Sequence, residues 1–153
     1  KIEKIAISST KIRNSINQGD LETTRKYLGR FFSLTGKVVK GDGLGKQIDY
    51  PTANILIEED YKIIPKDGVY YIRTTIDNKL YNGMMNIGHR PTIGNKAKSI
   101  EVNLFNFDRD IYDKIISVDV VVKIRDEKKF SSINALKAQL SKDEEHCLKL
   151  INK

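Results

Sequence analysis

Short segments in which apolar and polar residues alternate, separated by brief turns, constrain the fold of this chain most. They cover residues 69–76, 80–87, 100–107 and 118–124, and a similar alternation starts at Phe31. Alternation with a period of two predicts half-buried strands, and short turns between them favour antiparallel pairing. We therefore expect a mainly β domain, a barrel or a sandwich, and not a series of βαβ units.

The first thirty residues carry helical signals instead. Ser8, Ser9 and Thr10 are good N-cap residues and predict a helix over residues 11–17, after a short apolar run. A second helix is predicted over residues 21–28, which lie between Asp20 and Gly29.

The last segment switches to helical spacing. Apolar residues from Ile133 to Ile151 fall on one side of a helix by their spacing, and Ser131 or Ser132 can cap the start. Cys147 falls on this apolar stripe, so we interpret it as a core residue and not as a nucleophile. The pattern predicts one C-terminal helix with a single buried face.

Composition excludes several classes of protein. No apolar run approaches the roughly 20 residues that a membrane-spanning helix needs. One cysteine and two histidines leave little material for a Cys/His zinc site. A single cysteine cannot form an internal disulfide, which fits a reducing cytosol, so we expect a cytoplasmic protein.

The net charge of +7 in 153 residues raises the question of a nucleic-acid partner. Residues 1–50 hold ten basic and five acidic side chains, residues 51–112 hold eight of each, and residues 113–153 hold nine and seven. The excess therefore lies mainly in the first third. It is not organised into basic blocks with interleaved aromatic residues, so nucleic acid is not the expected partner.

A glycine-rich loop is the first candidate site. Gly41, Gly43 and Gly45 precede Lys46. Small residues let backbone N–H groups approach phosphate oxygens, and a lysine adds positive charge. The spacing does not match a Walker A loop, because Gln47 stands where Ser or Thr is needed. On its own this loop is better explained as a connection between strands.

Three further polar residues could carry chemistry. Thr52 and Asn54 would share one face of a strand, and a hydroxyl and an amide oxygen suit Mg²⁺ when phosphates fill its other positions. A turn cap after Pro51 is the simpler reading of this pair. Glu101 would point away from its apolar neighbours and could accept a hydroxyl proton, although an exposed strand glutamate is the simpler alternative. Residues 125–130 form either a solvated charged loop or a lid.

These features occur together and in an order that strongly resembles the riboflavin kinase domain. The motifs are Gly-x-Gly-x-Gly at 41–45, Pro-Thr-Ala-Asn at 51–54, Asp-Gly-Val-Tyr at 67–70, Asn-Ile-Gly-x-Arg-Pro-Thr at 86–92, Glu101, and Arg-Asp-Glu-x-x-Phe at 125–130. The resemblance covers roughly residues 31–150. It implies a six-stranded antiparallel Greek-key barrel with a C-terminal helix. It also implies transfer of the γ-phosphate of ATP, with Mg²⁺, to the 5′-hydroxyl of riboflavin, giving FMN and ADP.

The resemblance also implies roles for individual residues. Glu101 would be the catalytic carboxylate, and Thr52 and Asn54 would hold the Mg²⁺–phosphate unit. The remaining positions that match would bind the substrates: Gly41, Gly43 and Lys46 over the ATP phosphates, Leu104, Asn106 and Tyr112 on the nucleotide side, and Arg125, Lys128 and Phe130 in a flap on the flavin side.

The chain also departs from the family pattern at three places. Asn103 stands where a histidine often follows the glutamate, Asp113 replaces a frequent glycine, and Asp49-Tyr50 precedes Pro51 where Gly-Phe is common. None of these departures removes a residue with an assigned chemical role, so we expect an active kinase.

The N-terminal residues resemble the end of an adenylyltransferase module. Ile7-Ser8-Ser9-Thr10-x-Ile12-Arg13 is similar to the closing motif of that half in bifunctional riboflavin kinase/FAD synthetases. The resemblance therefore predicts an adenylyltransferase tail and helical linker over residues 1–30 and a kinase barrel over residues 31–153. The partner would be the missing module of the same protein. A small basic barrel that binds nucleic acid and a flavin-binding module without catalysis are the alternatives.

Overall fold

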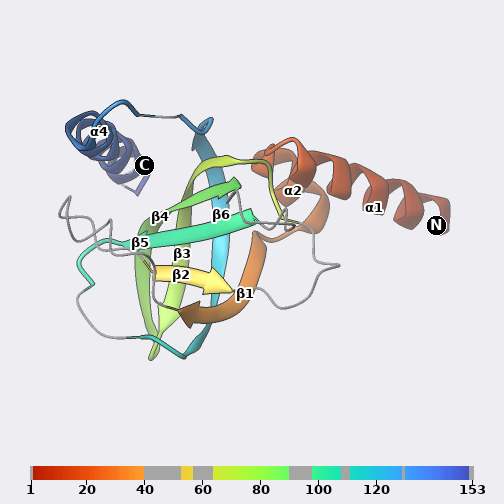
Figure 1. Ribbon diagram of the computed structural model, residues 1–153. Coiled ribbons are helices and arrows are strands. Elements are labelled where there is room, and N and C mark those ends of the chain that lie inside the picture. Colours follow the sequence, from red (N-terminus) through yellow and green to blue (C-terminus); the bar gives the residue numbers. More distant parts are fainter. Residues whose placement is uncertain are drawn as a thin grey trace, which may run out of the picture.

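Six antiparallel strands close into a barrel (Figure 1). The computed structural model describes residues 2–39, 53–56, 64–89, 98–107, 111–128 and 130–151. The strands are β1 (Phe32–Val39), β2 (Ala53–Leu56), β3 (Gly68–Ile76), β4 (Lys79–His89), β5 (Lys98–Leu104) and β6 (Ile115–Arg125). Around the barrel their order is β1-β2-β5-β4-β3-β6. The prediction of a mainly β fold is confirmed, and closure distinguishes a barrel from a sandwich.

The connection of the strands is a Greek key. β3, β4 and β5 pair in succession, and β6 returns to pair with β3. This return of a fourth strand beside the first of three consecutive strands defines the motif. β1 and β2 complete the barrel between β6 and β5. The implied Greek-key topology is therefore present.

The turn between β3 and β4 lies in the short gap that the sequence pattern leaves between residues 76 and 80. Asp77 and Asn78 both have positive φ, 52° and 66°, and connect the paired residues Ile76 and Lys79. Two consecutive residues in this region form the type I′ turn whose twist matches that of the flanking strands. Asp and Asn tolerate this conformation better than most residues, so the turn fixes the register of the hairpin locally.

The interior of the barrel is apolar and accounts for the alternation in the sequence. Every second residue of the strands points inward, and the residues between them point outward. The buried interior residues include Leu34, Val38, Ile55, Tyr70, Ile72, Met85, Ile87, Ile100, Val102, Val118 and Val120. A functional site that uses strand residues with polar side chains must therefore lie on the outer surface or at the ends.

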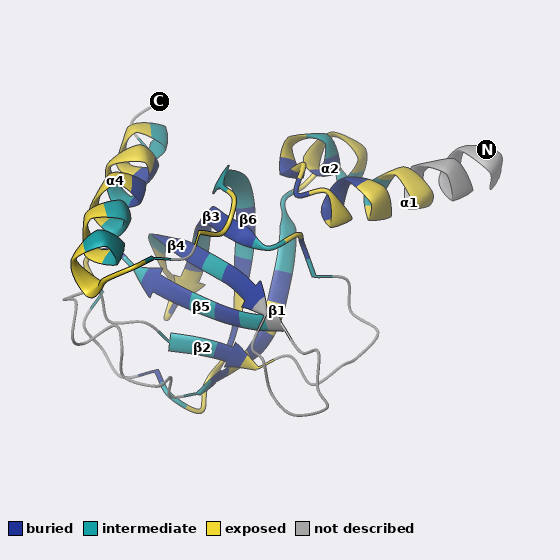
Figure 2. Ribbon diagram, turned by 45° about the horizontal axis from the view of Figure 1, so that its top comes forward, coloured by how far each residue is buried: buried dark blue, intermediate teal, exposed yellow. Residues whose placement is uncertain are grey.

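Within the described residues, three helices accompany the barrel: α1 (Ile2–Asn17), α2 (Leu21–Leu28) and α4 (Ile133–Ile151). The α1–α2 pair and α4 lie on opposite sides of the barrel, and one face of α4 remains exposed (Figures 1 and 2). Helix α4 begins as predicted, with the Ser132 hydroxyl accepting a hydrogen bond from the Ala135 N–H at 3.1 Å. Helix α2 is also as predicted: the Asp20 carboxylate accepts from the Thr23 N–H, and Gly29 ends the helix at φ 74°.

The start of α1 was predicted wrongly. The helix begins at Ile2, so Ser8, Ser9 and Thr10 lie inside it and do not cap it. A cap residue marks a boundary only where the preceding backbone leaves the helix. Here the preceding residues include the strong helix formers Glu3, Lys4 and Ala6, and the helix continues through them.

Helix α2 contributes to the core of the barrel. Leu21 is 2% exposed and packs with the interior residues, and a buried contact of 2.6 Å between the Ser15 and Thr24 hydroxyls joins α1 to α2. Leu21 therefore covers apolar surface that belongs to the barrel. The division at residue 30 remains a prediction, and the packing of Leu21 shows that α2 and the barrel share one core.

Replacing Leu21 by Ala should destabilise the barrel itself. Removal of a buried leucine side chain costs about 2–5 kcal/mol, because contacts are lost and a cavity remains. Leu148→Ala is the matched control, since Leu148 is 41% exposed and its loss should change the free energy of unfolding by less than about 0.5 kcal/mol. Urea unfolding followed by circular dichroism measures both. Equal stability of the two variants would contradict a shared core.

Candidate functional site

A row of polar side chains crosses three neighbouring strands of the barrel. Asn54 of β2 lies opposite Glu101 of β5, and Glu101 lies opposite Asn86 of β4. The same row continues through Val69 of β3 to Arg125 at the end of β6. Barrel closure therefore places residues from distant parts of the sequence at one level. We call Asn54, Glu101 and Asn86 the outer polar row.

These three side chains point away from the apolar interior. Glu101 stands between Ile100 and Val102, each 3% exposed and packed in the interior. The neighbours of Asn86 on β4, Met85 and Ile87, are fully buried there as well. Successive side chains of a strand point to opposite faces. The sequence-based orientation of Glu101 is thus reproduced, and the outer polar row lies on the outside of the barrel.

Two buried oxygens in this row are notable. The side-chain Oδ1 atoms of Asn54 and Asn86 are buried, and neither has a hydrogen-bond partner among the residues that the structure describes. A buried acceptor without a partner costs about 1–3 kcal/mol, so most such atoms in folded proteins are paired. They flank Glu101 on both sides. The arrangement is suited to a ligand that supplies donors or a cation.

The donor set is appropriate for phosphate chemistry with a hard cation. Amide oxygens are ligands that Mg²⁺ accepts when phosphate oxygens complete its octahedral shell. Within the described part of the chain, no group of three His, Cys, Asp or Glu side chains could hold a metal alone. A metal at the outer polar row would therefore depend on substrate phosphates. The carboxylate of Glu101, placed between the two amides, can accept a proton.

Comparison with known proteins shows the family of this chain. Residues 28–151 match the sequence model of the family Flavokinase, described as riboflavin kinase. The chain belongs to the riboflavin kinase family. A bifunctional riboflavin kinase/FMN adenylyltransferase of Bacillus subtilis (strain 168) is 38% identical over 146 residues, which are 94% of this chain and 46% of that protein. This chain spans about half the length of the curated relatives that it matches.

Two solved structures share the fold. A Streptococcus pneumoniae protein described as a macrolide-efflux protein has a TM-score of 0.84 and 37% identity, over 90% of this chain and 45% of that one. The riboflavin kinase of Trypanosoma brucei has a TM-score of 0.55 and 24% identity, over 79% of this chain and 80% of that one. In the part of this chain that is described, no helix is long and apolar enough to cross a membrane.

The residues expected on the nucleotide side do not lie with the outer polar row. Leu104 and Tyr112 are partly buried and pack against the interior residues, the opposite face from Glu101. Asn106 is exposed in the turn after β5 and has φ 56°. Their roles in this riboflavin kinase family member remain predictions. Gly41, Gly43, Lys46 and Thr52 lie outside the described residues.

Two of the departures from the family pattern, at Asp113 and Asn103, have structural correlates, and Asp49-Tyr50 lies outside the described residues. Asp113 has φ 70°, a conformation that glycine adopts without cost, which accounts for the glycine common at this position. Its N–H donates to the Val38 carbonyl at 2.7 Å, so the turn forms with Asp as well. Asn103 is 9% exposed and lies two positions beyond Glu101, on the same outer face of β5.

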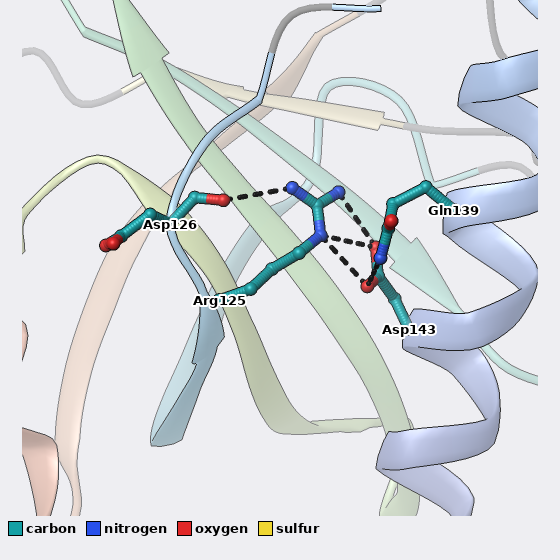
Figure 3. Close-up of polar contacts among 4 residues, drawn as sticks. All are labelled: Arg125, Asp126, Gln139 and Asp143. Carbon is teal, nitrogen blue, oxygen red and sulfur yellow. Dashed lines mark hydrogen bonds and ion pairs between the residues drawn. The ribbon is translucent and has the colours of Figure 1, made fainter.

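The three residues expected in the flavin-side flap lie together at the end of β6. Arg125 is largely occupied by Asp143 of α4, with contacts of 2.9 Å from Nε and from Nη2 (Figure 3). The guanidinium carbon of Arg125 is 5.8 Å from the ring centroid of Phe130, and Lys128 is exposed. Arg125 thus connects the end of β6 to α4, and the flap role of these three residues remains a prediction.

Two residues near the site, Asn86 and Asp143, were not given a role from the sequence. Asn86 belongs to a quoted motif, but only the register across β4 and β5 shows that it neighbours Glu101. Asp143 had a signal in the sequence: it falls on the apolar stripe of α4 between Leu140 and Cys147. A charged residue at a core-facing position requires a partner, which here is Arg125.

Cys147 is part of the core, as predicted. It is fully buried and packs with Val69, Tyr71, Met84 and Phe105, between α4 and the outer face of the barrel. Burial raises the pKa of its thiol to about 12, with Asp143 and Glu144 adding to the effect. The thiol therefore remains protonated at neutral pH, and it is not a nucleophile.

Replacing Asn86 by Leu should not destabilise the fold. Because its Oδ1 has no described partner, Asn86→Leu should leave the free energy of unfolding unchanged or raise it by about 1 kcal/mol. The control is Asn82→Leu on the same face of β4. Asn82 accepts a hydrogen bond from the Tyr71 hydroxyl at 2.6 Å, so its loss should lower stability by about 1–3 kcal/mol.

Chemical unfolding of both ligand-free variants gives the comparison. A large loss of stability in Asn86→Leu, equal to that of Asn82→Leu, would show that Asn86 has a structural partner and would remove it from the site.

Proposed function

We propose that this chain is an ATP-dependent riboflavin kinase that transfers the γ-phosphate of ATP to the 5′-hydroxyl of riboflavin. The family match over residues 28–151 supports the reaction. The single structural observation that supports its location is the position of Glu101 between Asn54 and Asn86, whose buried amide oxygens have no hydrogen-bond partner among the described residues. Phosphoryl transfer requires alignment of donor and acceptor and neutralisation of phosphate charge, and few groups suffice.

Glu101 acts on the acceptor hydroxyl. Its carboxylate accepts a hydrogen bond from the 5′-hydroxyl, orients the oxygen toward the γ-phosphorus, and takes the proton as the new bond forms. General-base assistance of this kind contributes about 10²–10⁴-fold to the rate. β5 pairs with β2 and with β4, so the backbone that carries Glu101 is held on both sides and needs little reorganisation.

Asn54 and Thr52 hold the metal–nucleotide complex. The Oδ1 atom of Asn54 is a hard oxygen donor that would hold Mg²⁺ together with Thr52, and the metal would supply positive charge against the phosphates. Gly41, Gly43 and Lys46 would cover the phosphates, while Leu104, Asn106 and Tyr112 would contact the nucleoside. On the flavin side, Arg125, Lys128 and Phe130 would close over the isoalloxazine ring and exclude water, which competes as an acceptor.

The parent protein has a wider activity in this proposal. Relatives of about twice this length are named bifunctional riboflavin kinase/FMN adenylyltransferase. We propose that this chain is the kinase part of such a protein, acts in the cytoplasm, and supplies FMN to an adenylyltransferase that makes FAD. A nucleic-acid-binding barrel is not favoured, because the charge of residues 51–112, which include most of the barrel, sums to zero.

Glu101→Gln should reduce turnover by about two orders of magnitude, because the amide keeps the shape and loses the proton acceptor. Formation of FMN and ADP from riboflavin and MgATP, resolved by chromatography, is the measurement. The control is Glu145→Gln, the same substitution at an exposed position of α4. Normal turnover in Glu101→Gln would refute the role of the carboxylate, and an inactive parent chain would refute the kinase proposal.

Asn54→Ala should weaken the metal-dependent part of nucleotide binding. The variant should bind ATP about tenfold more weakly than the parent in the presence of Mg²⁺ and equally in its absence, because the amide oxygen acts through the metal. Isothermal titration with and without Mg²⁺ measures the difference. Asn14→Ala, the same substitution at an exposed position of α1, is the control. An unchanged dependence on Mg²⁺ would contradict the assignment.

A further inference from the structure

A buried acidic residue on α4 is bound to the end of β6. The Asp143 side chain is 2% exposed, and the Arg125 side chain is 17% exposed. Arg125 Nε donates to Oδ1 and Oδ2 at 2.9 and 3.1 Å, and Nη2 donates to Oδ2 at 2.9 Å. Gln139, one turn earlier, donates to Oδ1 at 3.0 Å (Figure 3). The carboxylate therefore holds the guanidinium in one orientation.

The same guanidinium also holds the chain that leaves β6. Arg125 Nη1 donates to the backbone carbonyl of Asp126 at 3.0 Å. The Asp126 carboxylate bonds to Lys123 and lies 3.8 Å from Lys66, and the Lys123 contact lowers its pKa below the ordinary range. The first residue after β6, Asp126, is thus bound through both its backbone and its side chain. Among the residues involved, Asp143 is the most deeply buried.

The next residue lies against the strand that carries Asn86. At Gly88 of β4, an added Cβ would lie 2.4 Å from Oε1 and 3.1 Å from Oε2 of Glu127. The Glu127 carboxylate therefore lies directly against Gly88. It fits there because glycine has no side chain. Gly88 is two residues beyond Asn86 on the same outer face, about 7 Å along the strand. The carboxylate of Glu127 thus borders the outer polar row.

We propose that Asp143 is a positioning residue for the flavin side of the site: through Arg125 it holds the segment after β6 so that the Glu127 carboxylate rests on Gly88 beside the outer polar row. Asp143 itself contacts no substrate in this proposal. Glu127 supplies hydrogen-bond acceptors to the bound acceptor molecule. The proposal rests on the proposed kinase function and extends it by two residues with no previous role, Asp143 and Glu127.

The charge of Glu127 indicates which substrate it meets. A carboxylate next to the γ-phosphate without a bridging cation would repel it. Riboflavin instead carries ribityl hydroxyls and an imide N–H, all of which can donate to a carboxylate. The position of Phe130 near the Arg125 guanidinium places an aromatic ring in the same segment. The geometry therefore assigns this segment to the flavin and not to ATP.

Asp143→Asn tests the positioning role in the intact chain. The amide keeps the shape and loses the charge that orients Arg125, so the KM for riboflavin should rise about tenfold, with the KM for ATP and kcat within about twofold of the parent. Asp77→Asn in the β3–β4 turn is the control for the same substitution at a remote site. A purely structural role would lower the yield of folded enzyme and leave both KM values unchanged.

Gly88→Ala tests the same contact from the other strand and does not depend on α4. The new methyl group displaces the Glu127 carboxylate, so this variant should raise the KM for riboflavin selectively as well. Because both substitutions act through Glu127, the double variant should show a rise close to that of either single variant, about tenfold and not about a hundredfold.

The outcomes are distinct. A selective and non-additive rise in the KM for riboflavin supports the proposal. Unchanged KM values in a folded Asp143→Asn or Gly88→Ala variant, equal rises for ATP and riboflavin, or multiplicative effects in the double variant would overturn it. If Asp143→Asn does not fold, the result for Gly88→Ala decides alone. A parent chain that forms no FMN refutes the kinase function instead, and quenching of riboflavin fluorescence on binding then tests the positioning role independently.

Discussion

Closure of the barrel is the constraint on which the rest of the structure depends. In a closed antiparallel sheet every strand has two partners, so the register of one pair fixes the next. A shift of β5 by one residue would turn Glu101 into the apolar interior and bring Ile100 and Val102 to the surface. The interior packing therefore enforces the alignment of Asn54, Glu101 and Asn86, although none of these three takes part in that packing. The apolar interior residues therefore determine the position of the site without contacting a substrate themselves.

The polar groups around the barrel follow two different rules. Asp143 is buried and fully engaged, with Arg125 and Gln139 as its partners. The amide oxygens of Asn54 and Asn86 are buried and lack partners among the described residues. The first arrangement fixes one orientation of α4 relative to β6, as a satisfied buried ion pair does. The second leaves binding capacity unused in the ligand-free chain, which is a common feature of sites where stability is sacrificed for function.

Local features could be predicted from the sequence because short-range chemistry determines them. Asp77 and Asn78 specify the type I′ turn, Gly29 ends α2, and Ser132 caps α4, each within a few residues of its partner. The motifs also gave the family and pointed to Asn54 and Glu101. The contribution of Asn86 could not be predicted, because it depends on pairing between β4 and β5. The extended start of α1 was missed for the opposite reason: good N-cap residues at 8–10 were outweighed by the helix formers before them.

In the proposed function, the outer polar row receives the metal-bound phosphates of ATP. Side-chain amide resonances of the isotope-labelled chain, recorded with ADP and increasing Mn²⁺ in place of Mg²⁺, test it most directly, since a paramagnetic ion broadens nearby signals. The amides of Asn54 and Asn86 should broaden first, while those of Asn78 in the β3–β4 turn and Asn82 toward the far end of β4 stay sharp. Broadening of Asn78 and Asn82 with Asn54 unaffected would place the nucleotide elsewhere and contradict the proposed site.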